Sequence, residues 1–529
     1  MHIHGKFWRF GTIAAVAVLT VIVNSGAGDA ASRKTGSCLS DPSERCVLDI
    51  LVRQGSPTDE IVEMLALAGR ANAAKRAAAK LGPEVRKLVE AIGFARAGDL
   101  AKSLAVAGKI KTEGRDAALG NIALALARRG DIDKALGIAA KVSTTETKAS
   151  FLWRIARVMA RTGKTNKLGH TINRAVRADP GTEKKVMPVL LALVKGGASN
   201  EVGDLILRPR GDGKPWTILI IEDAINMLIA HGKKDAARRI LVTFEKRIEA
   251  GKKLDRKMLL NLLVRSYAAL RDPRSPRTLY NRFKKEIDPG FLLIQLARSG
   301  DSLTALAALL VASEGTKLAR SGDRQHNQMY IRKIRVQVAI GIYASGDRRG
   351  AQKFANKIDA SLPLRGSKAW KEDILYVRIP LLAGTGRVGE ALQLAEQQKL
   401  KTVSLETLLA WYVLPSVAAS RDTADMLRFL NFLARTRAIR IDDSYDFRLF
   451  CDTIARKSWA GNLDKSRAVA SALLRASLAD TKSTEWDHEG VAKCQLWGGD
   501  YGGAIETVRA IKDRDDRQLI LLDILKHHL

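Results

Sequence analysis

The sequence predicts an all-α solenoid, an array of helical hairpins in which each hairpin stacks on the next. Three observations lead to this fold class. Hydrophobic residues make up 46% of the chain but aromatic residues only 5%, a balance that favours closely packed helices over strands. Glycine-marked turns return every 29 to 46 residues, and apolar residues three or four positions apart flank them. The chain of 529 residues is also longer than one core usually sustains.

The first 30 residues have the features of a secretory signal peptide. Lys6 and Arg9 give a positive start, residues 13–23 are apolar, and the stretch from Gly28 to Ala30 is the preferred cleavage site. An uncleaved anchor is the alternative, but the apolar run is well short of the roughly 20 residues that span a bilayer. We therefore expect export, to the periplasm of a Gram-negative bacterium or, alternatively, by secretion.

Residues 31–82 are predicted to form an N-terminal cap with a first, poorly matched helical pair. Four cysteines remain after export, an even number in a compartment that permits disulfides. Their spacing suggests one bridge from Cys38 to Cys46 and one from Cys451 to Cys494, which are 43 residues apart, about one repeat. Four buried free thiols are the alternative.

The repeat array is predicted over residues 83–515, in about twelve units. The clearest copies are residues 95–104, 127–136 and 160–168, whose glycines are 32 and 33 positions apart. Arg271-Asp272 and Arg421-Asp422 fill larger gaps between units. Later turns are predicted at Gly197, Gly232, Gly300, Gly346, Gly386, Gly461 and Gly499. Residues 516–529 are expected to form a last apolar helix that caps the array.

Each unit follows one physical plan, which the second copy shows. Leu119, Ile122 and Leu126 lie three or four positions apart and so share one helical face. Gly130 is expected to end that helix in the left-handed backbone that glycine accepts, and Asp131 to cap the next helix. A single hairpin cannot cover its own apolar face, so the units must stack. A generic Ala/Leu-rich bundle is the alternative, and the recurring turns argue against it.

This order of a small residue, a Gly-Asp turn and an alanine in the next helix resembles the tetratricopeptide repeat. It occurs at Ala123, Gly130 and Ala135, and again at Ala339, Gly346 and Ala351. The resemblance covers roughly residues 85–515 and implies a right-handed α-solenoid of antiparallel helical hairpins. The sequence departs from the family because the aromatic positions of the first helix are mostly aliphatic and the closing proline is largely missing. Only the architecture is therefore expected to carry over.

A net charge of +32 indicates a surface that attracts anions. Three stretches break the repeat period, residues 208–215, 271–277 and 313–327, and are expected to be exposed loops that often mark a binding face. Tolerated insertions and a merely solvated basic surface are the alternatives. The candidate binding residues are Arg208, Arg210, Lys214, Arg274, Arg277, Lys317, Arg320 and Arg324.

No catalytic motif is found in the sequence. Gly163-Lys164-Thr165 lacks the glycine five positions earlier that a phosphate-binding loop requires, and neither Gly-x-Ser-x-Gly nor His-Glu-x-x-His occurs. Because Cys-x-x-Cys is missing and the eight histidines are scattered, no metal or other cofactor is expected.

The function predicted is a non-catalytic exported scaffold that presents a basic helical-repeat surface to a protein or peptide partner in the cell envelope. A binder of an anionic envelope polymer or glycan is one alternative, and an enzyme with a site assembled from dispersed residues is another. Nucleic acid is not expected for an exported protein, and any membrane contact should be peripheral. A continuous basic groove would favour the polymer, and a basic convex back would disfavour it.

Overall fold

In the computed structural model the described residues are 44–54, 58–250, 256–301, 324–361, 374–397, 413–420 and, with small gaps, 501–528, together with isolated positions between these ranges. Every regular element within them is helical. The predicted all-α solenoid is therefore confirmed, while the hand of the superhelix and the number of twelve units stay predictions. The segment predicted to be a signal peptide, residues 1–30, lies outside the described residues.

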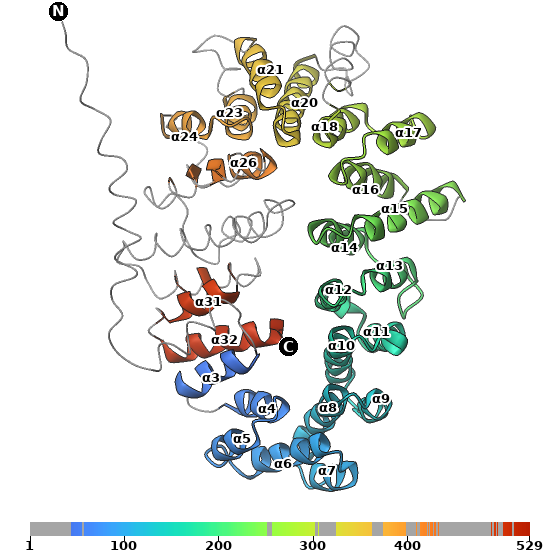
Figure 1. The fold of residues 1–529 in the computed structure, drawn as a ribbon, viewed down its shortest axis with the longest axis vertical. Coiled ribbons are helices and arrows are strands. Elements are labelled where there is room, and N and C mark those ends of the chain that lie inside the picture. Colours follow the sequence, from blue (N-terminus) through green and yellow to red (C-terminus); the bar gives the residue numbers. More distant parts are fainter. Residues whose placement is uncertain are drawn as a thin grey trace, which may run out of the picture.

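Helices pair as hairpins, and the first helix of each pair packs against the first helix of the next (Figure 1). The first helices are α4 (Asp59–Leu67), α6 (Pro83–Ala97), α8 (Thr112–Arg129), α10 (Thr145–Arg161), α12 (Val186–Lys195), α14 (Ile218–Ala230), α16 (Arg256–Ala269), α18 (Pro289–Ser299), α20 (Arg324–Ser345) and α23 (Ile379–Gly384). The second helices, which form the outer row, are α5 (Ala71–Ala78), α7 (Leu100–Ala107), α9 (Ile132–Ala140), α11 (Leu168–Ala178), α13 (Ser199–Leu207), α15 (Lys234–Glu249), α17 (Arg274–Arg282), α21 (Arg348–Ala360) and α24 (Val388–Gln397).

The predicted turn glycines adopt the left-handed backbone that ends each first helix. The φ angle is 91° at Gly98 and 101° at Gly130, and it is positive at every other described turn glycine of the predicted series. Arg271 adopts the same conformation with φ of 57°, which confirms a degenerate turn at Arg271-Asp272. The turns predicted at Gly461 and Gly499 lie outside the described residues.

The capping role predicted for Asp131 is wrong. Asp131 stands at the N-cap position of α9 but accepts no hydrogen bond from that helix, and its carboxylate lies 3.4 Å from the side chain of Arg129 instead. At the equivalent position Asp99 does accept a bond from the Lys102 amide, at 3.1 Å.

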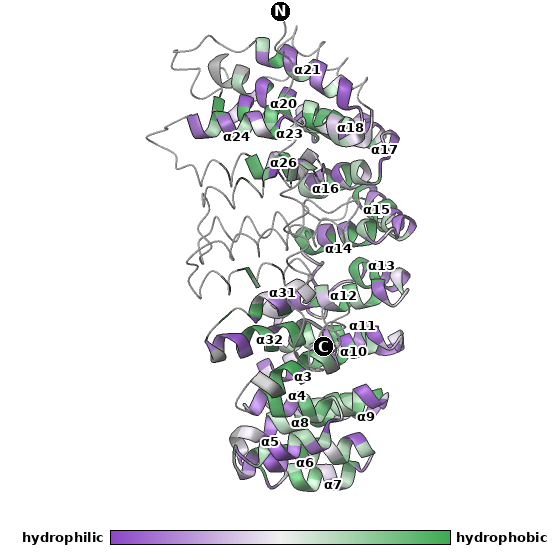
Figure 2. Ribbon diagram, turned by 60° about the vertical axis from the view of Figure 1, so that its left-hand side comes forward, coloured by the Kyte–Doolittle hydropathy of each residue, from purple (hydrophilic) through white to green (hydrophobic). Residues whose placement is uncertain are grey.

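Small residues let neighbouring first helices approach one another. At Gly120, in α8, the ring of Phe151 from α10 lies so close that a Cβ atom would overlap it. Alanines Ala118 and Ala123 on the same helix are fully buried. Hydrophobic residues concentrate where helices face each other, and hydrophilic residues at helix ends and outer surfaces (Figure 2). The low aromatic content of the chain suits this close packing.

The described helices trace an elongated curve, and the first and last of them lie side by side (Figure 1). The helices from α8 to α18 form a nearly straight limb, and the chain bends sharply at both ends of it. At one bend α4 contacts α8, and at the other α20 contacts α26 (Leu414–Ser420), so that first helices two steps apart meet. None of the described helices has both the length and the apolar character needed to cross a membrane.

The two ends of the described chain meet. The first described helix, α3 (Glu44–Gln54), packs against the last one, α32 (Arg514–His528), which also contacts α31 (Tyr501–Val508). Val47 and Leu48 of α3 and Leu521 and Leu525 of α32 are fully buried and belong to one continuous core. The terminal helices thus cover each other's apolar faces.

Candidate functional site

Part of the positive charge serves the stacking of repeats. The ammonium of Lys164 donates a hydrogen bond of 2.9 Å to the carbonyl oxygen of Gly130, in the turn of the preceding repeat. In the same way the guanidinium of Arg96 donates to the carbonyl oxygen of Leu67 at the end of α4. Helix C-termini carry unpaired carbonyls and partial negative charge, which these cations satisfy.

Carboxylates make the matching contacts at the opposite ends of the helices. Asp116, near the start of α8, accepts bonds of 2.7 to 3.0 Å from the amides and hydroxyls of Ser143 and Thr144, in the turn before α10. These bonds hold the pKa of Asp116 well below its ordinary value. Glu84, near the start of α6, makes the equivalent contact. It accepts a hydrogen bond of 3.1 Å from the amide of Lys111, which lies 27 residues later and directly before α8.

The predicted loop at residues 208–215 is present, but its three cations differ. Arg208 and Lys214 are exposed. Arg210 is only 10% exposed, and its guanidinium is enclosed by the carboxylates of Glu183 and of Asp212, the latter at 2.7 Å. Arg210 is therefore not an exposed loop cation as expected, because both carboxylates compensate its charge, and its binding role stays a prediction.

The stretch 271–277 is not a loop along its whole length. Helix α17 begins at Arg274, and Asp272 accepts bonds from the amides of Arg274 and Ser275 at 3.1 and 3.3 Å, which starts the helix. Arg274 and Arg277 are thus helical residues, contrary to the loop prediction. Arg274 is exposed, and Arg277 forms an ion pair with Asp301.

The third predicted loop, residues 313–327, is helical in its last part, and residues 313–323 lie outside the described residues. Arg324 is the first residue of α20, so it belongs to a helix of 22 residues and not to a loop. Lys317 and Arg320 lie outside the described residues. Cys46, on α3, is disulfide-bonded. Cys38, Cys451 and Cys494 fall outside the described residues, so the proposed pairing stays a prediction.

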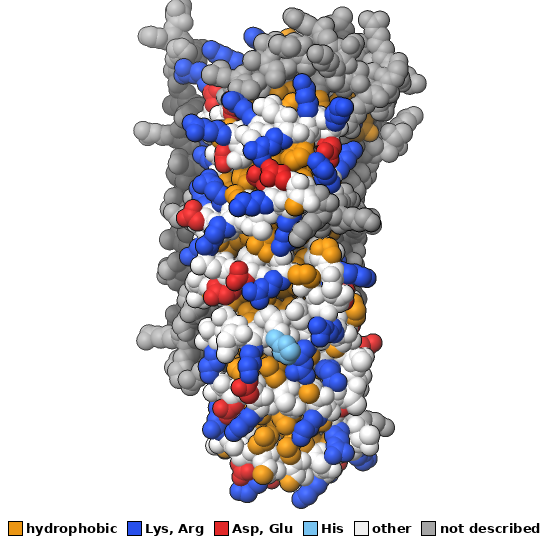
Figure 3. Space-filling view, turned by 90° about the vertical axis from the view of Figure 1, so that its right-hand side faces the viewer, with side chains coloured by type: hydrophobic (Ala, Val, Ile, Leu, Met, Phe, Trp, Pro, Cys, Tyr) orange, Lys and Arg blue, Asp and Glu red, His pale blue; other side chains and the backbone are white. Residues whose placement is uncertain are grey.

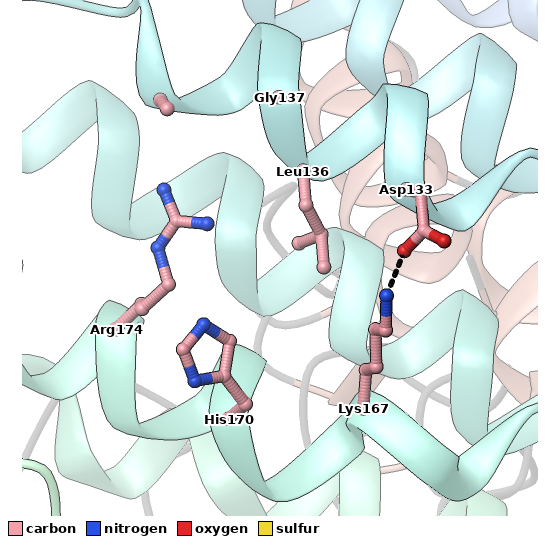
Figure 4. A pocket seen from close by; sticks show the side chains of 7 residues that line it. Asp133, Leu136, Gly137, Lys167, His170 and Arg174 are labelled. Carbon is pink, nitrogen blue, oxygen red and sulfur yellow. Dashed lines mark hydrogen bonds and ion pairs between the residues drawn. The ribbon is translucent and has the colours of Figure 1, made fainter.

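A shallow hollow of about 380 Å³ lies between the outer helices α9 and α11 (Figure 4). Successive turns of α9 contribute one stripe of side chains to it, and successive turns of α11 contribute the other. The lining residues are Asp133, Leu136, Gly137 and Ala140 from α9, with Lys167, His170 and Arg174 from α11 and the turn before it.

The two ends of this hollow differ in charge. At one end the ammonium of Lys167 forms an ion pair with Asp133 (Figure 4). At the other end Arg174 and His170 point toward α9, and no carboxylate in the described part of the chain pairs with either. The hollow is therefore neutral at the Asp133 end and cationic at the Arg174 end.

The convex face of the limb carries many basic side chains (Figure 3). Lys and Arg are spread over the visible surface as separate positions, with fewer Asp and Glu and some hydrophobic side chains between them. The convex back of the limb is therefore basic. In the described residues no three His, Cys, Asp or Glu side chains are grouped as a metal site would require.

A second cluster of titratable groups lies at the bend formed by α20 and α26. Asp422 accepts a bond of 3.1 Å from the Tyr343 hydroxyl and lies 2.8 Å from the guanidinium of Arg348. Burial, together with the charge of Asp422, raises the pKa of Asp425. Burial also raises the pKa of Tyr343, to about 12. Asp422 caps the backbone amide of Ala424 at 2.9 Å, so the cluster serves to join helices at the bend.

The hollow was not predicted from the sequence. Its lining includes a glycine in the middle of an outer helix, Gly137, and a histidine and an arginine one repeat later, His170 and Arg174. Glycine is costly inside a helix. Gly137 alone does not mark the hollow, however, because Gly93 and Gly389 are also exposed helical glycines with open space around them.

The paired helices, the left-handed glycine turns and the first-helix stacking are those of a tetratricopeptide-like helical-repeat protein. No family model and no curated protein matches the sequence. Among solved structures the chain is similar to the pentatricopeptide repeat protein PPR10 in complex with an 18-nt psaJ RNA element, at 13% identity and a TM-score of 0.24, covering 91% of this chain and 84% of that one.

Two further structures are similar at the same level. PPR10 from maize shares 14% identity with a TM-score of 0.20, over 98% of this chain and 93% of that one. The Cut9-Hcn1 hetero-tetramer of APC/C shares 13% identity with a TM-score of 0.18, over 95% and 99%. At these values the likeness carries no argument about what this chain binds.

Proposed function

We propose that the chain is a non-catalytic exported scaffold that binds a protein partner in the cell envelope through the convex face of its straight limb. One observation supports this above all. The turn cations and the opposing carboxylates are engaged between repeats, as at Lys164 and Asp116, whereas Arg174 and His170 remain free beside a hollow. Free charge next to a concavity is what a partner can use.

A protein partner fits this arrangement better than a charged polymer. A polymer with regularly spaced anionic groups would be matched by a continuous run of free cations. Among the residues that line the hollow, the ammonium of Lys167 is paired with Asp133. One turn beyond Arg174 on α11, the guanidinium of Arg177 donates to the Gly211 carbonyl at 2.7 Å. The guanidinium of Arg174, at the cationic end of the hollow, favours one anionic group on a folded surface.

Photocrosslinking in intact cells tests the proposal. A benzophenone amino acid at Lys141, which is exposed and lies beside the hollow without lining it, should capture a protein. The same group at Gly389, an exposed glycine on α24 with open space around it, serves as the control. Capture of a protein at position 141 alone supports the proposal. Recovery of glycan or nucleic acid without protein, or of nothing, overturns it, and fractionation of the same cells tests the proposed export.

A further inference from the structure

The geometry points to the hollow between α9 and α11 as an anion site that receives one acidic side chain, glutamate or aspartate, of a protein partner. This inference rests on the proposed function and deepens it by naming the group that is recognised. Three features of the hollow carry it: a free guanidinium, an apolar floor and a missing side chain at Gly137.

The free guanidinium is that of Arg174, which is half-buried and points from α11 toward α9 (Figure 4). Arginine binds carboxylates through two parallel hydrogen bonds, and this pairing is stronger than one between neutral groups. Arg177, one turn further along the same helix, is already bound to the Gly211 carbonyl. Arg174 is therefore the cation that α11 leaves available.

The floor of the hollow is apolar. Leu136 is 6% exposed, and Ala140 lies one turn further on α9. The methylene groups of a glutamate or aspartate side chain can cover this floor while the carboxylate reaches Arg174. His170 stands beside Arg174 and offers a ring nitrogen as a second donor (Figure 4). Asp133 is the one carboxylate that lines the hollow. Its ion pair with Lys167 compensates its negative charge and so reduces its repulsion of an incoming anion.

Space for the incoming side chain comes from Gly137. A Cβ atom placed at this position meets no atom within 4 Å, so the helix face is open there. A larger residue at 137 would fill the hollow without disturbing the packing of α9. Two substitutions can therefore test the site separately. A larger residue at Gly137 removes its space, and a neutral residue at Arg174 removes its charge.

Binding is tested on the full chain with a small probe, N-acetyl-Gly-Glu-Gly-amide, and its glutamine counterpart, followed by NMR of labelled histidine rings. His170→Asn identifies the His170 signal. We expect this signal to respond to the glutamate peptide and not to the glutamine peptide. Arg174→Gln should weaken binding about tenfold or more, as loss of a charge-assisted bond does. Gly137→Leu should abolish binding.

Matched controls separate the site from general charge and stability effects. Lys214→Gln removes an exposed cation elsewhere, and Gly389→Leu adds the same side chain to an open position on α24, so both should bind as the unaltered chain does. Gly137→Leu should not lower the melting temperature, because leucine is the better helix former. Equal response to both peptides, or tighter binding of inorganic phosphate than of the glutamate peptide, would overturn the inference.

Crosslinking from Lys141, beside the hollow, separates this inference from the proposed function. A protein captured from the unaltered chain, with capture reduced about tenfold or more by Arg174→Gln and by Gly137→Leu but retained in Lys214→Gln, supports both. If a protein is captured equally from all variants, the proposed anion site is wrong, while the proposed scaffold function still stands. No captured protein from any variant overturns the scaffold itself, whatever the small probe shows.

Discussion

The ammonium of Lys164 lies 2.9 Å from the carbonyl oxygen of Gly130, one repeat earlier in the chain. One repeat before that, the guanidinium of Arg129 lies against Gly98, where any side chain would overlap it. Successive turns are therefore closed by a cation from the following repeat. The glycine serves two purposes, the left-handed backbone and the room that the cation needs.

Lys164→Met should weaken the contact between the repeats of α8 and α10. Because the bond is exposed, we expect the free energy of unfolding to fall by less than about 1 kcal/mol, and the loss to shrink at high salt. Urea denaturation at low and high salt measures both effects. Lys134→Met, at an exposed residue of α9, is the control, and an equal loss there would show that the turn contact contributes nothing.

Gly120→Ala should be strongly destabilising. Its Cβ would overlap the ring of Phe151, which is 6% exposed and has little room to move. Overpacking of this kind costs about 1 to 3 kcal/mol. Gly137→Ala is the matched substitution in an open helical position and should raise stability by up to about 1 kcal/mol. Chemical denaturation followed by circular dichroism gives both values, and effects of the same sign would contradict the close helix approach.

Asp116→Asn should change how stability depends on pH. Hydrogen bonds, first that from the Ser143 amide, lower the pKa of Asp116 in the folded chain, whereas the unfolded chain has the ordinary value of 3.8. The stabilisation is present above that value and is lost as the pH falls below it toward the folded pKa. The melting temperature of the variant should therefore fall less between about pH 5 and pH 3 than that of the unaltered chain. Asp235→Asn, at an exposed position on α15, is the matched control substitution.

Arg271→Gly should stabilise the chain slightly. A left-handed backbone costs a residue with a side chain about 1 to 2 kcal/mol, and glycine removes this cost. Glycine also has more conformational freedom in the unfolded chain, which offsets about 0.5 to 1 kcal/mol of that stabilisation. We expect a net gain of up to about 1 kcal/mol. Gly346→Ala, at a turn glycine with φ of 110° and open space around it, should lose about 1 kcal/mol. Thermal unfolding of both variants checks the opposite signs.

The turn positions could be predicted from the sequence because each depends on local backbone preferences. Glycine at 98 and 130 marks a left-handed residue, and Asp272 marks a helix start even after Arg271. Residues 271–277 were predicted to be a loop because they contain the prolines at 273 and 276, but α17 begins at Arg274. A proline in the first helical turn lacks only an amide that would have no partner there, so it is compatible with α17.

Contacts between repeats could not be predicted from local preferences. Nothing near Arg210 in sequence shows that Glu183, 27 residues earlier, will share its charge. The hollow likewise depends on how α9 and α11 are placed, because residues of both helices line it. The elongated curve is the sum of small rotations between successive hairpins, and these depend on packing details such as the ring of Phe151 over Gly120.

The contact between α3 and α32 changes what the ends of this chain can do. In an open array the outermost repeats have neighbours on one side only and fray first. Here the helices that are most distant in sequence among those described supply each other's missing neighbour, so local opening at either one must also expose the other. Their apolar faces are also unavailable for stacking by a second molecule, and growth into a filament through these ends is blocked.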